Sequence, residues 1–117
     1  MTRIRKRKAK RGRTRLSKAR LDRLVEDAIV DCYNESEQVT GLYTMIEDHL
    51  ALPFETTVLG VPVTVERVDL TQREEIVAVC WRAGVRQTVP IIDLRLPSPR
   101  PAGAEWIDAY RHWLGGD

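Results

Sequence analysis

Residues 31–54, DCYNESEQVTGLYTMIEDHLALPF, are the stretch that decides how this chain folds. They predict the end of one helix, a second helix over about 35–50, and the entry into a first strand. Asn34 is followed three residues later by Glu37, as in a capping box. Pro53 ends the helix, because the residue before a proline is held in extended geometry. The carboxylates of this stretch, with one that lies just past its end, are Asp31, Glu35, Glu37, Glu47, Asp48 and Glu55.

An amphipathic helix is predicted upstream, from an N-cap at Ser17 to about Tyr33. Its apolar residues recur at i, i+3, i+4, i+7, i+8 and i+11, which is one face of a helix. They are Leu21, Leu24, Val25, Ala28, Ile29 and Cys32.

The pattern downstream is that of short β-strands. Val61, Val63 and Val65 alternate, and Val68 and Leu70 continue on the other parity, so a bulge is expected near residues 66–67. The further elements predicted are a strand at 75–82, a turn at 83–84, a returning strand at 85–89, a single helical turn at 90–93 and a last helix at about 103–114. The fold class is therefore predicted to be α+β, with two N-terminal helices, a small SH3-like antiparallel barrel and a C-terminal helix.

The charges of this 117-residue chain are strongly segregated. Residues 1–23 carry twelve Lys or Arg and one acid, a net charge of +11. Residues 24–117 carry seven Arg and sixteen acids, a net charge of −9, and the two parts give the +2 of the whole chain. We therefore predict a basic disordered arm at 1–16 and a single acidic domain at 17–117.

Two interpretations of the basic arm stay open. It could bind nucleic acid, anionic lipid or another polyanion, largely without sequence preference, because no aromatic residue stands among its charges. It could equally be a solubilising tail, or fold back on the acidic domain. The residues for polyanion binding would be Arg3, Arg5, Lys6, Arg7, Lys8, Lys10, Arg11, Arg13 and Arg15.

Several classes of protein are disfavoured by the sequence. Cys32 and Cys80 are single and widely spaced, which is typical of buried, reduced cysteines rather than of a zinc site. No apolar run approaches the roughly 18 residues that span a membrane, and the N-terminus lacks the apolar core of a secretory signal. We expect a cytoplasmic protein. We expect no enzyme, because no nucleophile elbow, glycine-rich phosphate loop or His-based metal triad is found.

The acidic stretch favours a site for a hard cation, and calcium fits because it takes six to eight oxygen ligands in loose geometry. At about 1.5 Å per residue, Glu37 and Asp48 lie roughly 16 Å apart along a helix and cannot hold the same ion. Two clusters therefore remain, one of Asp31, Glu35 and Glu37, and one of Glu47, Asp48 and Glu55. No EF-hand spacing is present, so moderate affinity is expected. The alternative is a solvated acidic face stabilised by the helix dipole.

A family resemblance supports calcium. It is carried by Asp31, Tyr33, Glu35, Glu37-Gln38, Gly41, Tyr43, Ile46-Glu47-Asp48, Leu50 and Leu52-Pro53-Phe54, then by VTVERVD at 63–69, VAVCWRAGVRQTVPIIDL at 77–94 and the helix between Trp106 and Trp113. Over about residues 20–114 the chain resembles the small calcium-binding proteins typified by the cyanobacterial protein CcbP.

The resemblance implies calcium binding without catalysis, in a buffering or signalling role. The chain departs from the family pattern in the thinned aromatic segment at 42–45 and in its basic arm. The candidate ligands are the six acids above and Asp108 in the last helix.

Overall fold

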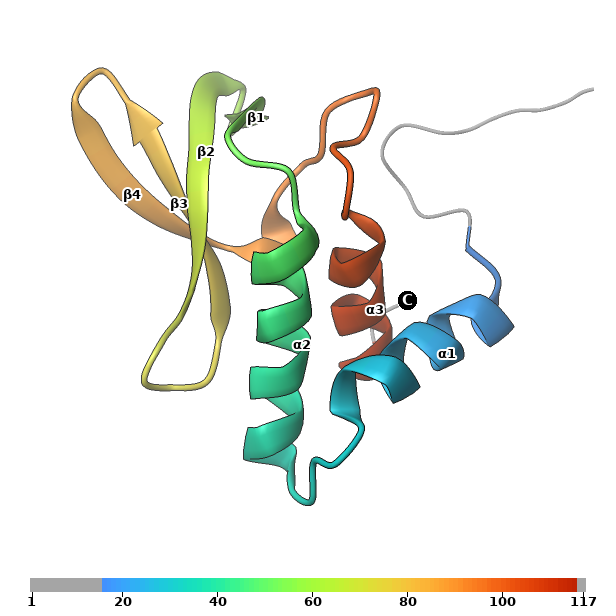
Figure 1. Ribbon diagram of the computed structural model, residues 1–117. Helices are drawn as coiled ribbons and strands as arrows, with labels where there is room; N and C mark the ends of the chain where they lie inside the picture. Colours follow the sequence, from blue (N-terminus) through green and yellow to red (C-terminus); the bar gives the residue numbers. More distant parts are fainter. Residues whose placement is uncertain (1–15, 116–117) are drawn as a thin grey trace, which may run out of the picture.

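Three α-helices lie on one side of a four-stranded antiparallel sheet in the computed structural model, which describes residues 16–115 (Figure 1). The elements are α1 (Lys18–Ile29), α2 (Glu35–His49), β1 (Phe54–Val58), β2 (Val61–Leu70), β3 (Ile76–Arg82), β4 (Val85–Pro90), the 3-10 turn η1 (Ile91–Asp93) and α3 (Glu105–Trp113). The α+β class is confirmed. The predictions for residues 1–15, which make up nearly all of the basic arm, lie outside the described residues.

The first helix begins as predicted but ends earlier. Ser17 is its N-cap, and its Oγ accepts a hydrogen bond from the backbone N–H of Arg20 at 3.1 Å. The predicted end at Tyr33 is wrong, because the chain leaves helical geometry at Val30 and Asp31 has a φ of 67°. The apolar period continues to Cys32, so periodicity alone did not reveal this turn.

The second helix and its cap agree with the prediction. The Asn34 Oδ1 accepts a hydrogen bond from the Glu37 backbone N–H at 2.8 Å. The Glu37 Oε1 in turn accepts from the backbone N–H of Tyr33 at 2.7 Å. This reciprocal pair satisfies the Glu37 N–H in the first turn of the helix and the Tyr33 N–H just before the cap. The carboxylate of Glu37 therefore has a structural role at the cap.

The strands form an open meander in the order β1-β2-β3-β4, and every neighbouring pair is antiparallel. The predicted bulge is confirmed, because the register between β2 and β3 shifts between Val65 and Arg67. The SH3-like barrel is not confirmed. The strands β1 and β4 are the two edges of the sheet and do not pair with each other, so the sheet is not closed.

The core lies between the sheet and the helices. Leu42 and Ile46 of α2, Ile107 of α3, and Val65 and Ile76 of the sheet have no exposed surface. These residues join the two layers in one hydrophobic cluster. Because the apolar faces of α2 and α3 are fixed against the sheet, their ends and the loops beside them are held in defined positions.

The helix α1 contacts both α2 and α3 and lies beyond them as seen from the sheet (Figure 1). Its approach to α2 depends on Gly41. A Cβ at Gly41 would lie 2.3 Å from the carbonyl oxygen of Ala28, which is closer than atoms can pack. Gly41 therefore sets the distance between α1 and α2. None of the described helices has the length and apolar composition needed to cross a membrane.

Candidate metal-binding site

The acids predicted at the N-terminal end of α2 lie on the surface where α1 turns into α2. Asp31, Glu35 and Glu37 are all exposed. Asp31 stands in the turn with its positive φ of 67°, and Glu37 caps the helix through the backbone N–H of Tyr33. Glu35 is the first residue of α2, where the helix dipole favours negative charge. Of the three, Asp31 and Glu35 are left without a capping role.

A hollow of about 190 Å³ opens beside Glu35. It lies between the start of α2, the β2–β3 turn and the end of α3, and its walls are both acidic and aromatic. The residues that line it are Glu35, Val39, Arg73, Glu74, Tyr110, Trp113 and Leu114. We call it the α2 hollow. Two glutamates and one arginine therefore line the same small volume.

Glu74 was not among the residues that the sequence predicted for the site. It lies in the tight turn between β2 and β3, where the Glu74 backbone N–H donates to the Thr71 carbonyl at 2.9 Å, and it has a φ of 64°. The Ser36 Oγ donates a short hydrogen bond to the Glu74 carboxylate and so ties this turn to α2. The sequence shows a turn between two strands, but nothing in it shows that this turn meets the start of α2.

The acids at the C-terminal end of α2 are in a different position. The Tyr43 hydroxyl donates to the Glu47 Oε2 at 3.0 Å. Burial, together with the Glu47 carboxylate and the charge of Asp69, raises the pKa of Tyr43 to about 12. The hydroxyl therefore stays protonated and serves Glu47 as a hydrogen-bond donor. Tyr43 links this carboxylate to strand β2, because its Oη also lies 3.5 Å from the Val68 carbonyl oxygen.

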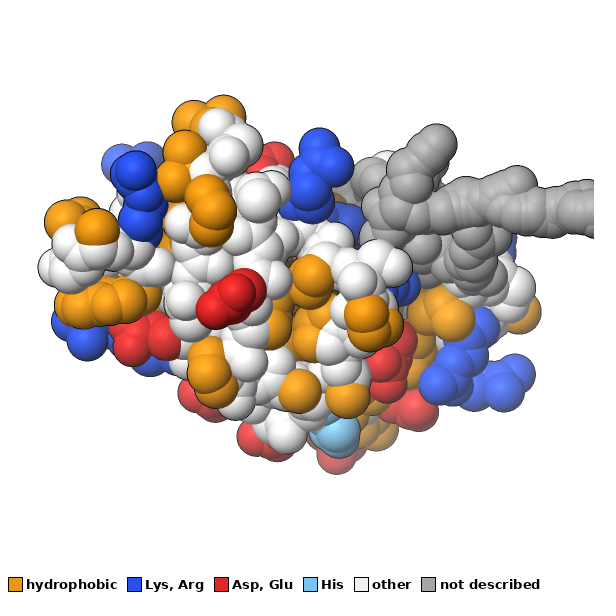
Figure 2. All heavy atoms as spheres, turned by 90° about the horizontal axis from the view of Figure 1, so that it is seen from above, with side chains coloured by type: hydrophobic (Ala, Val, Ile, Leu, Met, Phe, Trp, Pro, Cys, Tyr) orange, Lys and Arg blue, Asp and Glu red, His pale blue; other side chains and the backbone are white. Residues whose placement is uncertain are grey.

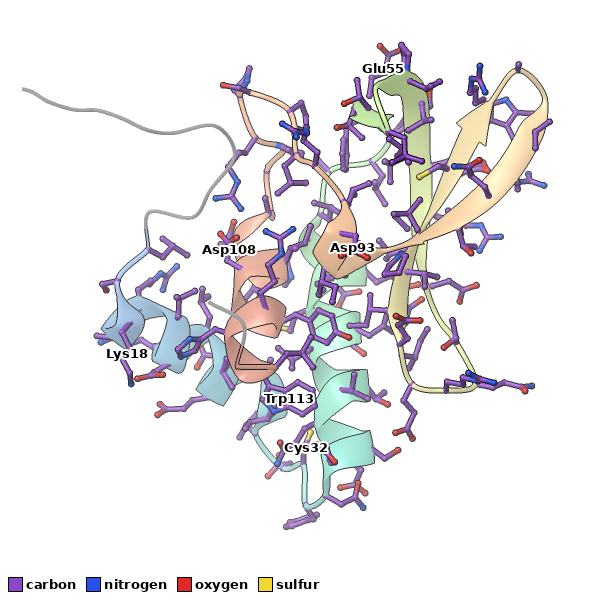
Figure 3. The ribbon with its side chains drawn as sticks, turned by 180° about the vertical axis from the view of Figure 1, so that it is seen from behind. Lys18, Cys32, Glu55, Asp93, Asp108 and Trp113 are labelled. Atoms are coloured by element: carbon purple, nitrogen blue, oxygen red, sulfur yellow. The ribbon has the colours of Figure 1, made fainter. Side chains whose placement is uncertain are left out.

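Asp48 and Glu55 are exposed at this second end. Figure 2 shows the molecule from the side on which β1 lies, and acidic, basic and hydrophobic side chains are interspersed there. Glu55 is at the opposite end of the molecule from Cys32 and Trp113, which lie close to the start of α2 (Figure 3). The view therefore shows no single acidic patch at this end.

Asp108 is engaged by a neighbouring arginine. The Arg100 Nη2 donates to the Asp108 Oδ2 at 2.7 Å, and the Asp108 side chain is 1% exposed. Figure 3 places Asp108 on α3, away from Glu55. Within the described part of the chain, the Asp108 Oδ1 and the Arg100 Nε are buried without a hydrogen-bond partner. This carboxylate is neutralised inside the protein and does not face the α2 hollow.

The predicted ligands do not form one preassembled cage. Within residues 16–115, no three His, Cys, Asp or Glu side chains converge closely enough to hold a metal ion. What the structure does bring together is Glu35 and Glu74, from segments far apart in the sequence. Both are hard carboxylate donors open to solvent, so water molecules could complete a coordination shell around them.

Comparison with known proteins identifies the family. The family model for CcbP-type proteins, which carries the description "Calcium binding", matches residues 22–114, most of the chain. The chain belongs to the CcbP family of calcium-binding proteins. The resemblance that residues 31–54 carry in the sequence is thereby confirmed. No curated protein sequence matches the chain at a significant level.

A solved structure shares the fold. The crystal structure of Anabaena CcbP superposes with a TM-score of 0.71 at 18% sequence identity, over 85% of this chain and 92% of that one. At this identity the comparison shows the fold alone. It shows that the two chains share the same overall fold.

Proposed function

We propose that this protein binds Ca²⁺ without catalysing a reaction, and that the main site lies at the N-terminal end of α2. Membership of a calcium-binding family supports the ion. The observation that supports the place is that Glu35 and Glu74 line the same hollow. Asp31, exposed in the preceding turn, is the nearest further acid along the chain that is free of a capping role.

The donor set suits calcium better than the transition metals. Carboxylates, hydroxyls and water are the ligands of a hard cation, and no thiolate or imidazole lines the hollow. Two carboxylates fill only part of a shell of six to eight oxygens, so a bound ion would keep several water molecules. Arg73 lies in the same hollow and opposes a cation. We therefore expect affinity in the weaker part of the protein range, roughly 10⁻⁵ to 10⁻³ M.

Calorimetric titration of the full-length protein with CaCl₂ tests the proposal. The variants Glu35→Gln and Glu74→Gln should each weaken binding by about tenfold or more, because each removes one of the two charged ligands. The matched control is Glu26→Gln, which removes one carboxylate from the exposed side of α1. Glu26→Gln should leave binding within about twofold, the effect expected of a remote surface charge. Heat of binding absent up to about 10⁻³ M calcium would reject the proposal.

The same titration compares the two ends of α2. Glu47, Asp48 and Glu55 remain the candidate ligands for a second, independent ion, and Asp48→Asn tests them with a minimal change of shape. If Asp48→Asn weakens binding and Glu74→Gln does not, the main site lies at the C-terminal end instead. The alternative of nucleic-acid binding rests on residues 1–15, outside the described part of the chain. It stays a prediction, to be tested by binding duplex DNA over a salt series.

A further inference from the structure

The α2 hollow has features that suit a basic side chain as well as a metal ion. Glu35 and Glu74 supply negative charge, which Arg73 opposes in part. Trp113, packed on the largely buried Tyr110, supplies aromatic surface. The two rings stack at a centroid distance of 6.3 Å, and the Trp113 Nε1–H donates to the Gln38 Oε1 at 3.0 Å. The aromatic wall is therefore held in a fixed orientation.

An arginine or lysine uses both kinds of surface. Its aliphatic part packs on an aromatic ring while its charged head stays near solvent. The head gains from carboxylates and from the face of an aromatic ring. A basic peptide is thus a chemically suitable occupant, and this chain carries one. Residues 1–15 hold nine of its nineteen Lys and Arg and no acid, against a net charge of −9 in residues 24–117.

The arm is long enough to reach the hollow. It joins the described chain just before α1, whose twelve residues span about 18 Å at 1.5 Å each. The far end of α1 leads through the short turn at 30–34 to Glu35, on the edge of the hollow. Fifteen residues can span up to roughly 50 Å when extended. The extended length of residues 1–15 is therefore more than twice the length of α1, the helix that separates the start of the described chain from the turn leading to Glu35.

We propose that residues 1–15 dock in cis on the α2 hollow, with Arg or Lys side chains between the two carboxylates and the aromatic wall. Because the same carboxylates are the proposed calcium ligands, the arm and calcium exclude each other. This second step rests on the proposed calcium site, whereas docking of the arm does not. The arm then sets the calcium concentration at which the protein responds.

Docking is tested on the full-length protein by paramagnetic relaxation. A nitroxide is attached at Thr2→Cys in a background with Cys32→Ser, since Cys32 is partly exposed and Cys80 is buried. At low salt and without calcium, the indole N–H resonance of Trp113 should broaden. The internal control is the indole of Trp81, which lies on the β3–β4 hairpin away from the hollow. Its resonance should stay sharp.

Raising the salt to about 1 M, where the Debye length is about 3 Å, should restore the Trp113 signal. A sharp Trp113 signal at low salt, or equal broadening of both indoles, would overturn the proposal. A mixture of two samples separates docking in cis from docking in trans. One sample carries the spin label but no isotope label, and the other carries the isotope label but no spin label. Broadening in that mixture at an undiminished level would overturn the assignment to cis.

Calcium titration then tests the exclusion. A full-length variant with the nine Lys and Arg of residues 1–15 replaced by Gln should bind calcium about two- to fivefold more tightly at low salt, the range expected from surface ion pairs. Broadening of Trp113 without any change in calcium affinity would reject the exclusion and leave docking intact. Absence of calcium binding in every variant would reject the proposed function, while the relaxation result would still decide docking.

Discussion

The buried pair of Arg100 and Asp108 gives the sharpest prediction about stability. The Asp108 side chain is 1% exposed and the Arg100 side chain 26%, and the Nη2 and Oδ2 atoms lie 2.7 Å apart. Replacing Arg100 by Met leaves a buried carboxylate without its counter-charge, which typically costs about 3–5 kcal/mol of unfolding free energy. For a chain of this size that lowers Tm by roughly 12–20 °C, at about 4 °C per kcal/mol.

The cost should be asymmetric between the two partners. Asp108→Leu leaves Arg100, whose partly exposed guanidinium can reach water, so this variant should be the less destabilised of the two. The double variant R100M/D108L removes both charges and should recover much of the loss, because an apolar pair of similar volume often matches a buried ion pair. We therefore expect the wild type and the double variant to be the most stable. Asp108→Leu should be less stable than both, and Arg100→Met should be the least stable.

Urea unfolding followed by circular dichroism measures these differences at neutral pH. The matched control is Arg95→Met, an exposed arginine in the same connecting segment, which should change the free energy of unfolding by less than about 0.5 kcal/mol. If the free energy of unfolding of Arg100→Met lies within about 1 kcal/mol of the wild-type value, the ion pair does not contribute the stability assigned to it. A double variant as unstable as Arg100→Met would also refute the reasoning.

Two further predictions concern the packing of α1. Gly41→Ala should lower the free energy of unfolding by about 1–3 kcal/mol in urea, since its Cβ would lie 2.3 Å from a backbone oxygen of α1, whereas Thr40→Ala on the exposed side should be near neutral. In Asp22, the hydrogen bond from His112 at 2.7 Å, helped by Lys18, lowers the carboxyl pKa below its unfolded value. Its contribution to stability is therefore present at neutral pH and lost as pH falls through that lowered pKa, and Asp22→Asn should remove this part of the pH dependence of urea unfolding.

Local signals in the sequence were enough to predict many of the elements. Asn34 and Glu37 form the predicted cap, and the change of parity after Val65 is the observed bulge. The end of α1 was mispredicted because Cys32 continues the apolar period after the backbone has already turned at Asp31. Closure of the sheet was mispredicted because it depends on pairing between β1 and β4, and short bent strands carry no information about that pairing.

The candidate site was harder to predict than the fold. The sequence placed acids at both ends of α2, and the structure leaves them there. The contact between Glu74 and Ser36 joins a turn to a helix 38 positions away in the sequence, and no periodicity reports such a pair. The pairing of Arg100 with Asp108 was missed for another reason. It depends on the path of the segment between η1 and α3, which sequence patterns do not define.

Burial explains why the density of acids in the sequence is a poor guide to ligands. Asp108 is neutralised by Arg100 in a place that water barely reaches, and releasing it to a metal ion would leave Arg100 without its partner. Glu35 and Glu74 are exposed, so exchanging a water molecule for calcium requires no such loss. Asp108→Asn should therefore lower stability in urea and leave calcium affinity within about twofold, as expected of a charge that its own partner already screens. Glu74→Gln should leave stability in urea unchanged and weaken calcium binding. If instead Asp108→Asn weakens calcium binding and Glu74→Gln does not, the ion lies on α3.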